Sequence, residues 1–504
     1  MFLLSAQDVL SLEVILHITL GVFIGYVAGV LPGMNRATVL AVVLPFTFAL
    51  SPLAAISMLI GINKGGAAGS AVSAILINVP GEPSSVMTAM DGYPLTKQGK
   101  SRKALKLALY ASVIGDILAT MVLIAIAPPL ARMALAVGPV ELTAILLFAI
   151  TFIAGVSGRS FVKGLIAGFL GLLVATPGLD IETGQPRLTF GMIELFDGVP
   201  LLAVAIGTLA LSEVLYQTDQ AWRGWYSRRS KSKISDDPDD SRLSFREFRE
   251  MLPTILRSTG IGTLLGIIPG LGASVSSFFA YMVAKQRSKT PEKFGKGALE
   301  GVAASEAADN ANVPASLVPV FAIGVPGSIS AALLMAAFFL NDVTPGPLIF
   351  RDEPRLIFGI YNGMILASGI MLVIGLFGAR LFSALATLPD TLILPPIVLF
   401  CIVGAYVEGG SMFSVYLMIG FAAFGYVMRK FDYSFVTFLI GFVLGPMLEL
   451  SLRQSMVITR GDFSRLYDHP FAIVFLVLAV AAAVQFTRKN ISPGNKGGRT
   501  RPEV

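Results

Sequence analysis

The sequence has little cysteine, little histidine and little charge. Its 504 residues include one cysteine, Cys401, so no intrachain disulfide can form. The two histidines, His17 and His469, lie near opposite ends of the chain, which disfavours a zinc or haem site. Only 14% of the residues are charged, whereas soluble domains have about 25%. These shortages disfavour a soluble protein and a metal-dependent one.

Apolar residues dominate instead. The chain is 54% hydrophobic with a mean hydropathy of +0.75, and apolar runs of about 20 residues recur, as in membrane-spanning helices. The formal net charge of +6 is spread over loops, which indicates membrane orientation rather than nucleic-acid binding. We therefore predict an all-α polytopic membrane protein in the lipid bilayer, with roughly 10–12 spanning segments and no nucleic-acid partner.

The apolar stretch over residues 61–93 is interrupted by polar and helix-breaking residues. Lys64 and Asn78 stand among alanine, isoleucine and valine, and Pro80 and Gly81 follow. Proline removes a backbone donor and breaks the helix, and the freed backbone groups cannot face lipid. Broken helices in matching positions of two halves indicate a transporter binding site.

The interrupted elements recur in one order along the chain. The matched segments are residues 25–33 with 262–270, 79–81 with 325–327, and 160–162 with 434–436. Three matches in the same order indicate a duplication. In addition, the glycines at positions 21, 25 and 29 predict a close helix-packing stripe, and the short apolar run over residues 37–50 predicts a re-entrant or half helix.

Two basic loops suggest how the repeats are oriented. The loop over residues 96–106 follows the first Val-Pro-Gly element, whereas the loop over residues 285–296 precedes the second. If both loops are cytoplasmic by the positive-inside rule, the repeats are inverted. The predicted organisation is a first membrane repeat (1–217), a basic and acidic cytoplasmic linker (218–252), a second membrane repeat (253–469), a final transmembrane helix (470–487) and a basic tail (488–504).

Acidic residues lie inside or beside apolar segments. A helix over residues 301–312 places Glu306, Asp309 and Asn310 on one face, and Asp116 lies within another apolar segment. Ionisable groups in such places indicate function by default. The alternative for the first group is a capped, interfacial helix start whose acids stay in water, and for Asp116 it is a carboxylate that faces a helix partner near the membrane interface.

The motifs resemble the large membrane subunit of tripartite tricarboxylate transporters. The resemblance rests on LPGMNRATVLAVVLPFTF, GGAAGSAVSAILINVPGEP, IIPGLGA and IGVPGS in that order. It implies a small four-helix membrane subunit and a periplasmic solute-binding protein as partners, and cation-driven carboxylate uptake across the bacterial cytoplasmic membrane. The chain departs from the family's usual residues at Asn63 and Lys64, commonly aromatic and glycine, and at Asp309, commonly asparagine.

The predicted sites follow from this chemistry. Helix N-termini and neutral polar groups can bind a carboxylate, and unwound carbonyls with acidic or amide oxygens can hold a cation. The predicted substrate-binding residues are Gly33, Asn35, Thr38, Lys64, Ser70, Asn78, Gly81, Gly270, Ser274, Gly327, Ser328 and Ser330. The predicted cation-binding residues are Asn78, Pro80, Glu306, Asp309, Asn310 and Pro326. Sodium or a proton is the coupling ion, with no other metal or cofactor and no catalytic residue.

Three alternatives stay open on the sequence. Lys64 either neutralises a substrate carboxylate or snorkels from a helix end. The chain is either a permease subunit fed by a binding protein or a stand-alone carrier or channel. An intramembrane enzyme is disfavoured, because the sequence contains neither His-Glu-x-x-His nor Gly-x-Gly-Asp.

Overall fold

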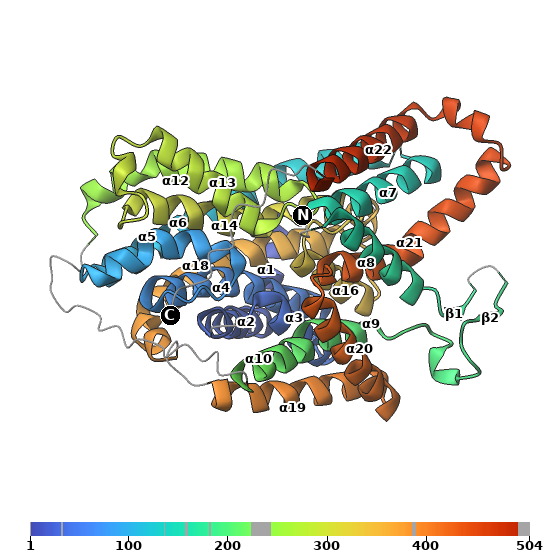
Figure 1. Cartoon of the computed structure of the whole chain (residues 1–504), viewed down its shortest axis with the longest axis horizontal. Helices are drawn as coiled ribbons and strands as arrows, with labels where there is room; N and C mark the ends of the chain where they lie inside the picture. Colours follow the sequence, from blue (N-terminus) through green and yellow to red (C-terminus); the bar gives the residue numbers. More distant parts are fainter. Residues whose placement is uncertain are drawn as a thin grey trace. The chain divides into compact units, whose positions relative to one another are not determined.

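The computed structural model describes residues 2–31, 34–135, 137–156, 160–180, 183–222, 243–385 and 390–491. Helices make up most of this described part, and its one sheet pairs β1 (Gly178–Leu179) with β2 (Pro186–Arg187) in antiparallel fashion (Figure 1). The chain forms two compact units. Unit 1 comprises residues 1–136 and 178–427, and unit 2 comprises residues 137–177 and 428–504.

Nine helices in the described part are long and apolar enough to cross a membrane. They are α2 (Leu12–Val30), α4 (Pro52–Ile77), α6 (Ser101–Ala134), α7 (Pro139–Val156), the stretch Leu201–Gln220, α18 (Pro354–Leu385), α20 (Met412–Lys430), α21 (Phe435–Thr459) and α22 (Pro470–Ile491). Shorter apolar helices lie in α8 (Phe161–Val174), α16 (Ile329–Leu340) and α19 (Asp390–Gly409), and over Arg36–Ala49. The prediction of an all-α polytopic membrane protein is confirmed.

Several further helices complete unit 1. They are α1 (Phe2–Val9), α5 (Val86–Lys97), α12 (Phe245–Ile267), α13 (Gly272–Arg287), α14 (Leu299–Ala315), α15 (Val318–Ile323) and α17 (Ile349–Asp352). The candidate span Leu201–Gln220 consists of α9 (Leu201–Ala205), η4 (Ile206–Leu211) and most of α10 (Ser212–Trp222). The predicted linker over residues 218–252 lies largely outside the described residues, and its described ends belong to α10 and α12. The predicted tail lies outside them beyond residue 491.

Glycines bring α2 and α4 into close contact. A Cβ on Gly25 of α2 would lie 2.2 Å from the carbonyl oxygen of Ile62, and one on Gly65 of α4 would lie 2.2 Å from that of Val22. Gly21 and Gly29 approach the backbone of α4 in the same way. Small residues allow helix backbones to approach this closely in membranes, so the predicted packing stripe is confirmed.

The two central helices of unit 1 are buried along nearly their whole length. Every residue of α4 from Ala54 to Ile77 is buried, and so is every residue of α14 from Gly301 to Ala315. Helices α6, α12 and α13 pack around α14 (Figure 1). A Cβ on Gly115 of α6 would lie 2.4 Å from the carbonyl oxygen of Ala307. Polar side chains on α4 and α14 therefore face protein and not lipid.

The two Pro-Gly tips, residues 78–85 and 324–330, end their helices in similar ways. Asn78 ends α4 with a left-handed φ of 56°, and Gly324 ends α15 with a φ of 71°. A Cβ on Gly81 would lie 2.4 Å from the carbonyl oxygen of Gly29, and one on Gly327 would lie 3.3 Å from that of Gly266. Gly29 and Gly266 occupy matching positions near the ends of α2 and α12, so each tip packs against the corresponding helix end. The predicted short element over residues 37–50 is α3 (Arg36–Val43) followed by η1 (Leu44–Ala49).

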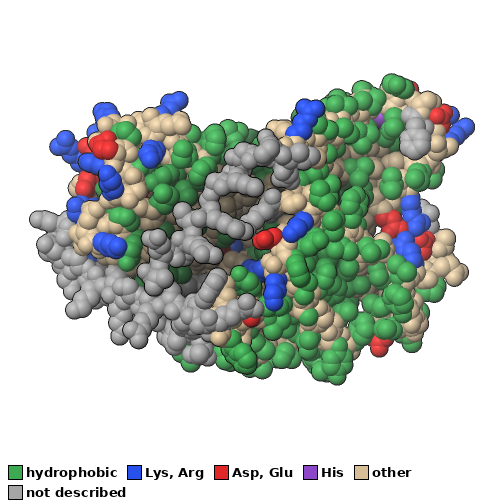
Figure 2. Space-filling view, in the orientation of Figure 1, with side chains coloured by type: hydrophobic (Ala, Val, Ile, Leu, Met, Phe, Trp, Pro, Cys, Tyr) green, Lys and Arg blue, Asp and Glu red, His purple; other side chains and the backbone are tan. Residues whose placement is uncertain are grey.

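The two basic loops lie at the same end of unit 1. Lys103 Nζ lies 2.8 Å from Glu247 Oε1 at the start of α12, and Gln98 Nε2 donates to the Lys296 carbonyl oxygen at 2.8 Å. Figure 2 shows charged side chains gathered over one end of α12 and α13, at the left of the view, and hydrophobic side chains beyond it. The inverted orientation of the repeats stays a prediction.

Unit 2 is a small helical bundle of α7, α8, α21 and α22. A Cβ on Gly171 of α8 would lie 2.0 Å from the carbonyl oxygen of Phe438 on α21. His469 Nδ1 lies 2.7 Å from Glu141 Oε1, which joins the start of α22 to α7. In this unit the duplicated Ser-Phe-Val segments begin α8 and α21, which pack against each other.

Candidate functional site

The first Pro-Gly tip, α3 and α14 bring three buried charged side chains together. Arg36 Nε lies 3.0 Å from Glu82 Oε2, and Arg36 Nη2 lies 3.0 Å from Asp309 Oδ1. The exposed fractions of Arg36, Glu82 and Asp309 are 8%, 6% and 1%. Of these three residues, only Asp309 was predicted from the sequence as a site residue, and Arg36 and Glu82 were not. Arg36 and Glu82 could have been recognised as the charged residues of the motifs LPGMNRAT and VPGEP. The other residues of these motifs are typical of turns and helix caps.

Local structure fixes this arrangement. Asn35 caps α3, because its Oδ1 accepts the Thr38 N–H at 2.8 Å. Glu82 Oε1 accepts the Arg36 N–H at 2.8 Å, so the carboxylate lies at the positive end of α3. Ser84 lies in the 3-10 helix η2 (Pro83–Ser85), directly before α5, and its hydroxyl donates to Asp309 Oδ2 at 3.0 Å. The tip therefore holds α14 through Ser84 and α3 through Glu82.

A third buried carboxylate, Glu306, lies one turn before Asp309 on α14. The Thr88 hydroxyl donates to its Oε1 at 2.5 Å and the Ser112 hydroxyl donates to its Oε2 at 3.0 Å. Asn310 Nδ2 donates to the same Ser112 oxygen at 2.8 Å, and Thr88 also bonds Ser305 at 2.9 Å. Among the described residues, Glu306 has no basic side chain within ion-pair distance.

The cluster has more negative than positive groups. The cluster contains one basic side chain, Arg36, and three carboxylates, those of Glu82, Asp309 and Glu306. When all four groups are ionised, two carboxylate charges have no basic partner within the cluster. Buried charges are costly unless they are paired. The arrangement therefore favours uptake of positive charge, as a cation or as protons.

Two residues in contact with the cluster have a buried polar atom without a hydrogen-bond partner among the described residues. These atoms are Arg36 Nη1 on α3 and Asn310 Oδ1 on α14. Buried polar atoms are nearly always hydrogen-bonded in proteins. The two atoms give the site an unused donor and an unused acceptor for a ligand.

Lys64 belongs to a separate buried ion pair. Its Nζ lies 2.7 Å from Asp116 Oδ2 and donates to the Met364 carbonyl oxygen at 2.8 Å and to Ser368 Oγ at 3.1 Å. Lys64 is 0% exposed in the middle of α4, so the snorkelling alternative is wrong in this structure. Its charge is balanced by Asp116 and is not presented to a ligand. The pair is neutral overall and leaves the charge of the cluster unchanged.

The other predicted site residues lie in several places. Gly33 lies outside the described residues. Ser70 Oγ donates to the Ala67 carbonyl oxygen of its own helix, while Asn78, Pro80 and Gly81 form the first tip. Ser274 is exposed on α13.

The second tip forms its own contacts. The Gly270 N–H donates to the Gly327 carbonyl oxygen at 3.1 Å, and Ser328 Oγ accepts the Ala331 N–H and donates to Ser316 Oγ. Pro326 precedes Gly327, and Ser330 is buried in the first turn of α16. In the described part of the chain, no hydrogen bond or ion pair joins this tip to the first one.

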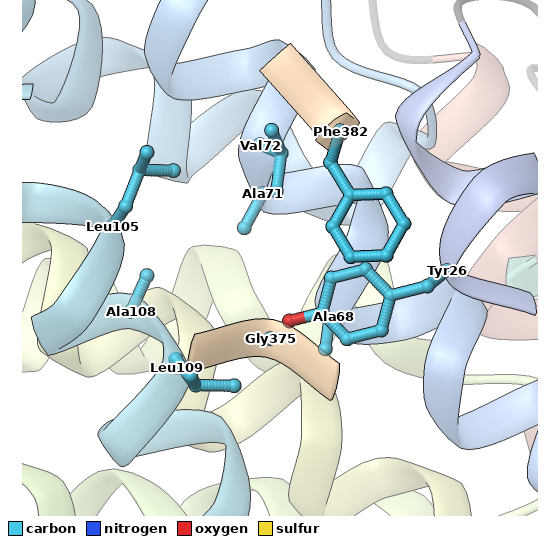
Figure 3. Close-up of a pocket in the computed structure, with 9 residues that line it drawn as sticks. All are labelled: Tyr26, Ala68, Ala71, Val72, Leu105, Ala108, Leu109, Gly375 and Phe382. Carbon is cyan, nitrogen blue, oxygen red and sulfur yellow. The ribbon is translucent and has the colours of Figure 1, made fainter. Parts of the chain in front are cut away.

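A pocket elsewhere in unit 1 does not suit a carboxylate. Figure 3 shows it between α2, α4, α6 and α18, where the Tyr26 ring stacks on Phe382 with 4.7 Å between centroids. Its remaining lining is Ala68, Ala71, Val72, Leu105, Ala108, Leu109 and Gly375. The Tyr26 hydroxyl is the only polar side-chain group in this set, so the charged cluster is the better candidate site.

Comparison with known proteins places the chain in a family. The sequence pattern of the Tripartite tricarboxylate transporter TctA family matches residues 15–440. The "Uncharacterized 52.8 kDa protein in TAR-I ttuC' 3'region" of Agrobacterium vitis is 36% identical over 465 residues, 92% of this chain and 91% of that protein. The "Uncharacterized protein in TAR-II ttuC' 3'region" of Agrobacterium vitis is 37% identical over 223 residues, 44% of this chain and 92% of that protein. No solved structure matches. The chain belongs to the tripartite tricarboxylate transporter TctA family.

Proposed function

We propose that this protein is the large permease subunit of a secondary active, cation-coupled uptake system for small carboxylates. In this proposal a periplasmic solute-binding protein delivers the substrate and a small four-helix subunit completes the permease in the bacterial cytoplasmic membrane. Membership of a tripartite family supports these partners. The observation that carries the proposal is the buried cluster of one arginine and three carboxylates at the end of a broken helix.

The cluster supports a carboxylate substrate. An arginine presents a planar set of donors that matches a carboxylate, and Arg36 Nη1 has no hydrogen-bond partner among the described residues. A buried arginine in a membrane protein is costly and therefore indicates function. Asn35 and Thr38, at the same end of α3, add neutral polar groups to this region.

The cluster also supports cation coupling. Glu306, the hydroxyls of Thr88 and Ser112 and the Asn310 amide gather oxygen atoms around one buried negative charge. Asn310 Oδ1 lacks a donor among the described residues, so it is available to a cation. We therefore favour sodium at Glu306, with a proton as the second candidate. Carbonyl groups near Asn78, Pro80 and Pro326 stay proposed as further ligands.

Reconstituted uptake tests the proposal. The full chain and its small subunit are placed in liposomes, with and without the binding protein, and uptake of radiolabelled citrate and succinate is measured under a sodium gradient or a pH gradient. We expect sodium-driven uptake that requires the binding protein. Glu306→Gln should abolish the sodium dependence. The control Glu292→Gln changes an exposed glutamate in the 3-10 helix η5 (Pro291–Lys293) and should leave the sodium dependence unchanged.

Other outcomes of this experiment would change the proposal. Uptake that needs no binding protein would favour the stand-alone carrier. Uptake driven equally well by a pH gradient without sodium would assign the coupling to a proton. Absence of carboxylate uptake under every gradient would contradict the proposed function for these acids.

A further inference from the structure

Glu82 lies where a ligand carboxylate would be expected to bind. Its Oε1 accepts the N–H of Arg36 at 2.8 Å, and its Oε2 lies 3.0 Å from Arg36 Nε. We propose that Glu82 is an internal competitor for this position, and that a substrate carboxylate replaces it at Arg36 and thereby releases the first Pro-Gly tip. This inference rests on the proposed function.

The site has the features of an anion-binding position. Helix N-termini and arginine side chains both favour carboxylates, and here the eight-residue helix α3 and its own first side chain provide both. Independently, Arg36 Nη1 is buried and without a hydrogen-bond partner among the described residues, while the residue is 8% exposed. The guanidinium therefore retains a donor for an incoming carboxylate while Nη2 stays on Asp309.

Of the two carboxylates on Arg36, Glu82 is the one that can leave. Asp309 lies in the middle of α14, whose residues 301–315 are all buried, and it also accepts the Ser84 hydroxyl hydrogen. Glu82 lies in the short connection between α4 and η2 (Pro83–Ser85). Connections move at lower cost than packed helices. Movement of Glu82 also moves Gly81, whose α-carbon packs against the Gly29 carbonyl oxygen.

Replacement of Glu82 by the substrate carboxylate gives a physical reason why substrate binding and cation binding are coupled. When a substrate carboxylate forms the ion pair with Arg36, Glu82 loses its counter-charge. The number of carboxylates without a basic partner in the cluster then rises by one. A cation that binds the same region is then favoured, and by linkage the cation favours the substrate equally. Glu82 therefore connects recognition of the substrate with the position of the tip and with the charge of the cluster.

Equilibrium binding to the full chain in lipid nanodiscs tests the exchange. Radiolabelled citrate and succinate are titrated at one fixed sodium concentration into the wild type, Glu82→Gln, Arg36→Lys and the control Glu292→Gln. Glu82→Gln removes the competing charge but keeps the shape of the side chain. If Arg36 is free of Glu82 in about a tenth of the wild-type molecules without substrate, the Kd for the acid should fall about tenfold in this variant. Arg36→Lys loses the planar donor set, so Kd should rise at least about tenfold. The control should bind like the wild type.

A second measurement on the wild type needs no variant. Hydrogen–deuterium exchange of residues 78–85 should increase when citrate is added, because the tip loses its contact with α3. Unchanged or slower exchange in this segment at saturating citrate would overturn the proposal, and so would an unchanged or higher Kd in a folded Glu82→Gln protein.

The binding experiment distinguishes failure of the proposed exchange at Arg36 from failure of the proposed carboxylate transport. If the wild type binds citrate or succinate and both variants bind with the same Kd, the exchange at Arg36 is wrong while the carboxylate permease stands. If the wild type binds neither acid up to the solubility limit, the proposed function fails for these acids and the exchange fails with it.

Discussion

Lys64 on α4 and Asp116 on α6 form a fully buried ion pair with 2.7 Å between Nζ and Oδ2. Ser368 on α18 contacts both charged groups, at 3.1 Å from the ammonium and 2.5 Å from the carboxylate. One pair of charges therefore joins three helices of unit 1. Removing either partner alone leaves the other charge buried, which is costly.

Breaking this pair should destabilise the protein. We expect Asp116→Asn to lower the free energy of unfolding by about 3–5 kcal/mol, because the ammonium of Lys64 loses its counter-charge. The double variant Lys64→Met with Asp116→Leu should recover most of the loss. Thermal unfolding in detergent measures both. A stable, unaltered Asp116→Asn protein would mean that Lys64 has another counter-charge or is neutral.

Asp309 should matter for transport more than for folding. In Asp309→Asn the amide oxygen can still accept from Arg36, but the negative charge is lost. Because the cluster loses one carboxylate charge while the hydrogen bond can persist, we expect uptake per folded molecule to fall at least about tenfold with near-normal yield. Normal uptake per folded molecule with an altered protein yield would show that Asp309 has a purely structural role.

Asp91 should hold the connection before α14 in place. Its Oδ1 accepts the N–H groups of Gly295, Gly297 and Ala298 at 2.8–3.0 Å, and its Oδ2 accepts the Tyr281 hydroxyl at 2.8 Å. We expect Asp91→Ala to increase hydrogen–deuterium exchange over residues 290–298. Tyr281→Phe removes one hydrogen bond, worth about 0.5–1.5 kcal/mol, and should have a smaller effect. Equal effects of the two variants would show that the backbone contacts contribute little.

The tip glycines should not accept a side chain. A Cβ on Gly81 would lie 2.4 Å from the Gly29 carbonyl oxygen, and one on Gly327 would lie 2.9 Å from that of Ser316. Overpacking of this kind typically costs about 1–3 kcal/mol, so Gly81→Ala should lower the melting temperature and Gly327→Ala should lower it less. Gly260→Ala, which meets open space inside α12, is the control and should not lower the melting temperature, because alanine favours the helix more than glycine does. Equal melting temperatures in all three variants would contradict the close approach.

Both basic loops should be accessible from the cytoplasm. We expect Lys100→Cys and Lys289→Cys to react with a membrane-impermeant thiol reagent in inside-out vesicles and not in intact cells, because basic loops stay on the cytoplasmic side. Cys401 is buried and provides the unreactive background. Labelling of the two positions from opposite sides would contradict their location at one end of unit 1.

Two of the three residues that depart from the family's usual pattern, Lys64 and Asp309, gain a charged partner in the structure. Lys64 pairs with Asp116, and Asp309 pairs with Arg36. In the sequence, Lys64 and Asp309 depart from the family's usual residues and Asp116 lies within an apolar segment, but no sequence pattern identifies a partner residue for any of them. Arg36 and Glu82 stayed unnoticed because each also fits a local role, at a helix start and in a turn.

Composition and local sequence patterns were enough to predict the membrane class, the helical fold, the glycine packing stripe and the position of the helix breaks. These follow from composition and from local chemistry, because apolar length, proline and glycine act on the residues next to them. The pairing of the buried charges, in contrast, depends on the three-dimensional packing of the helices. Arg36 and Asp309 are 273 residues apart in the sequence, and their contact depends on how α3, the first tip and α14 pack. Whether a buried charge is paired, shared or unbalanced is a property of that packing, because attraction between charges depends on their distance in space.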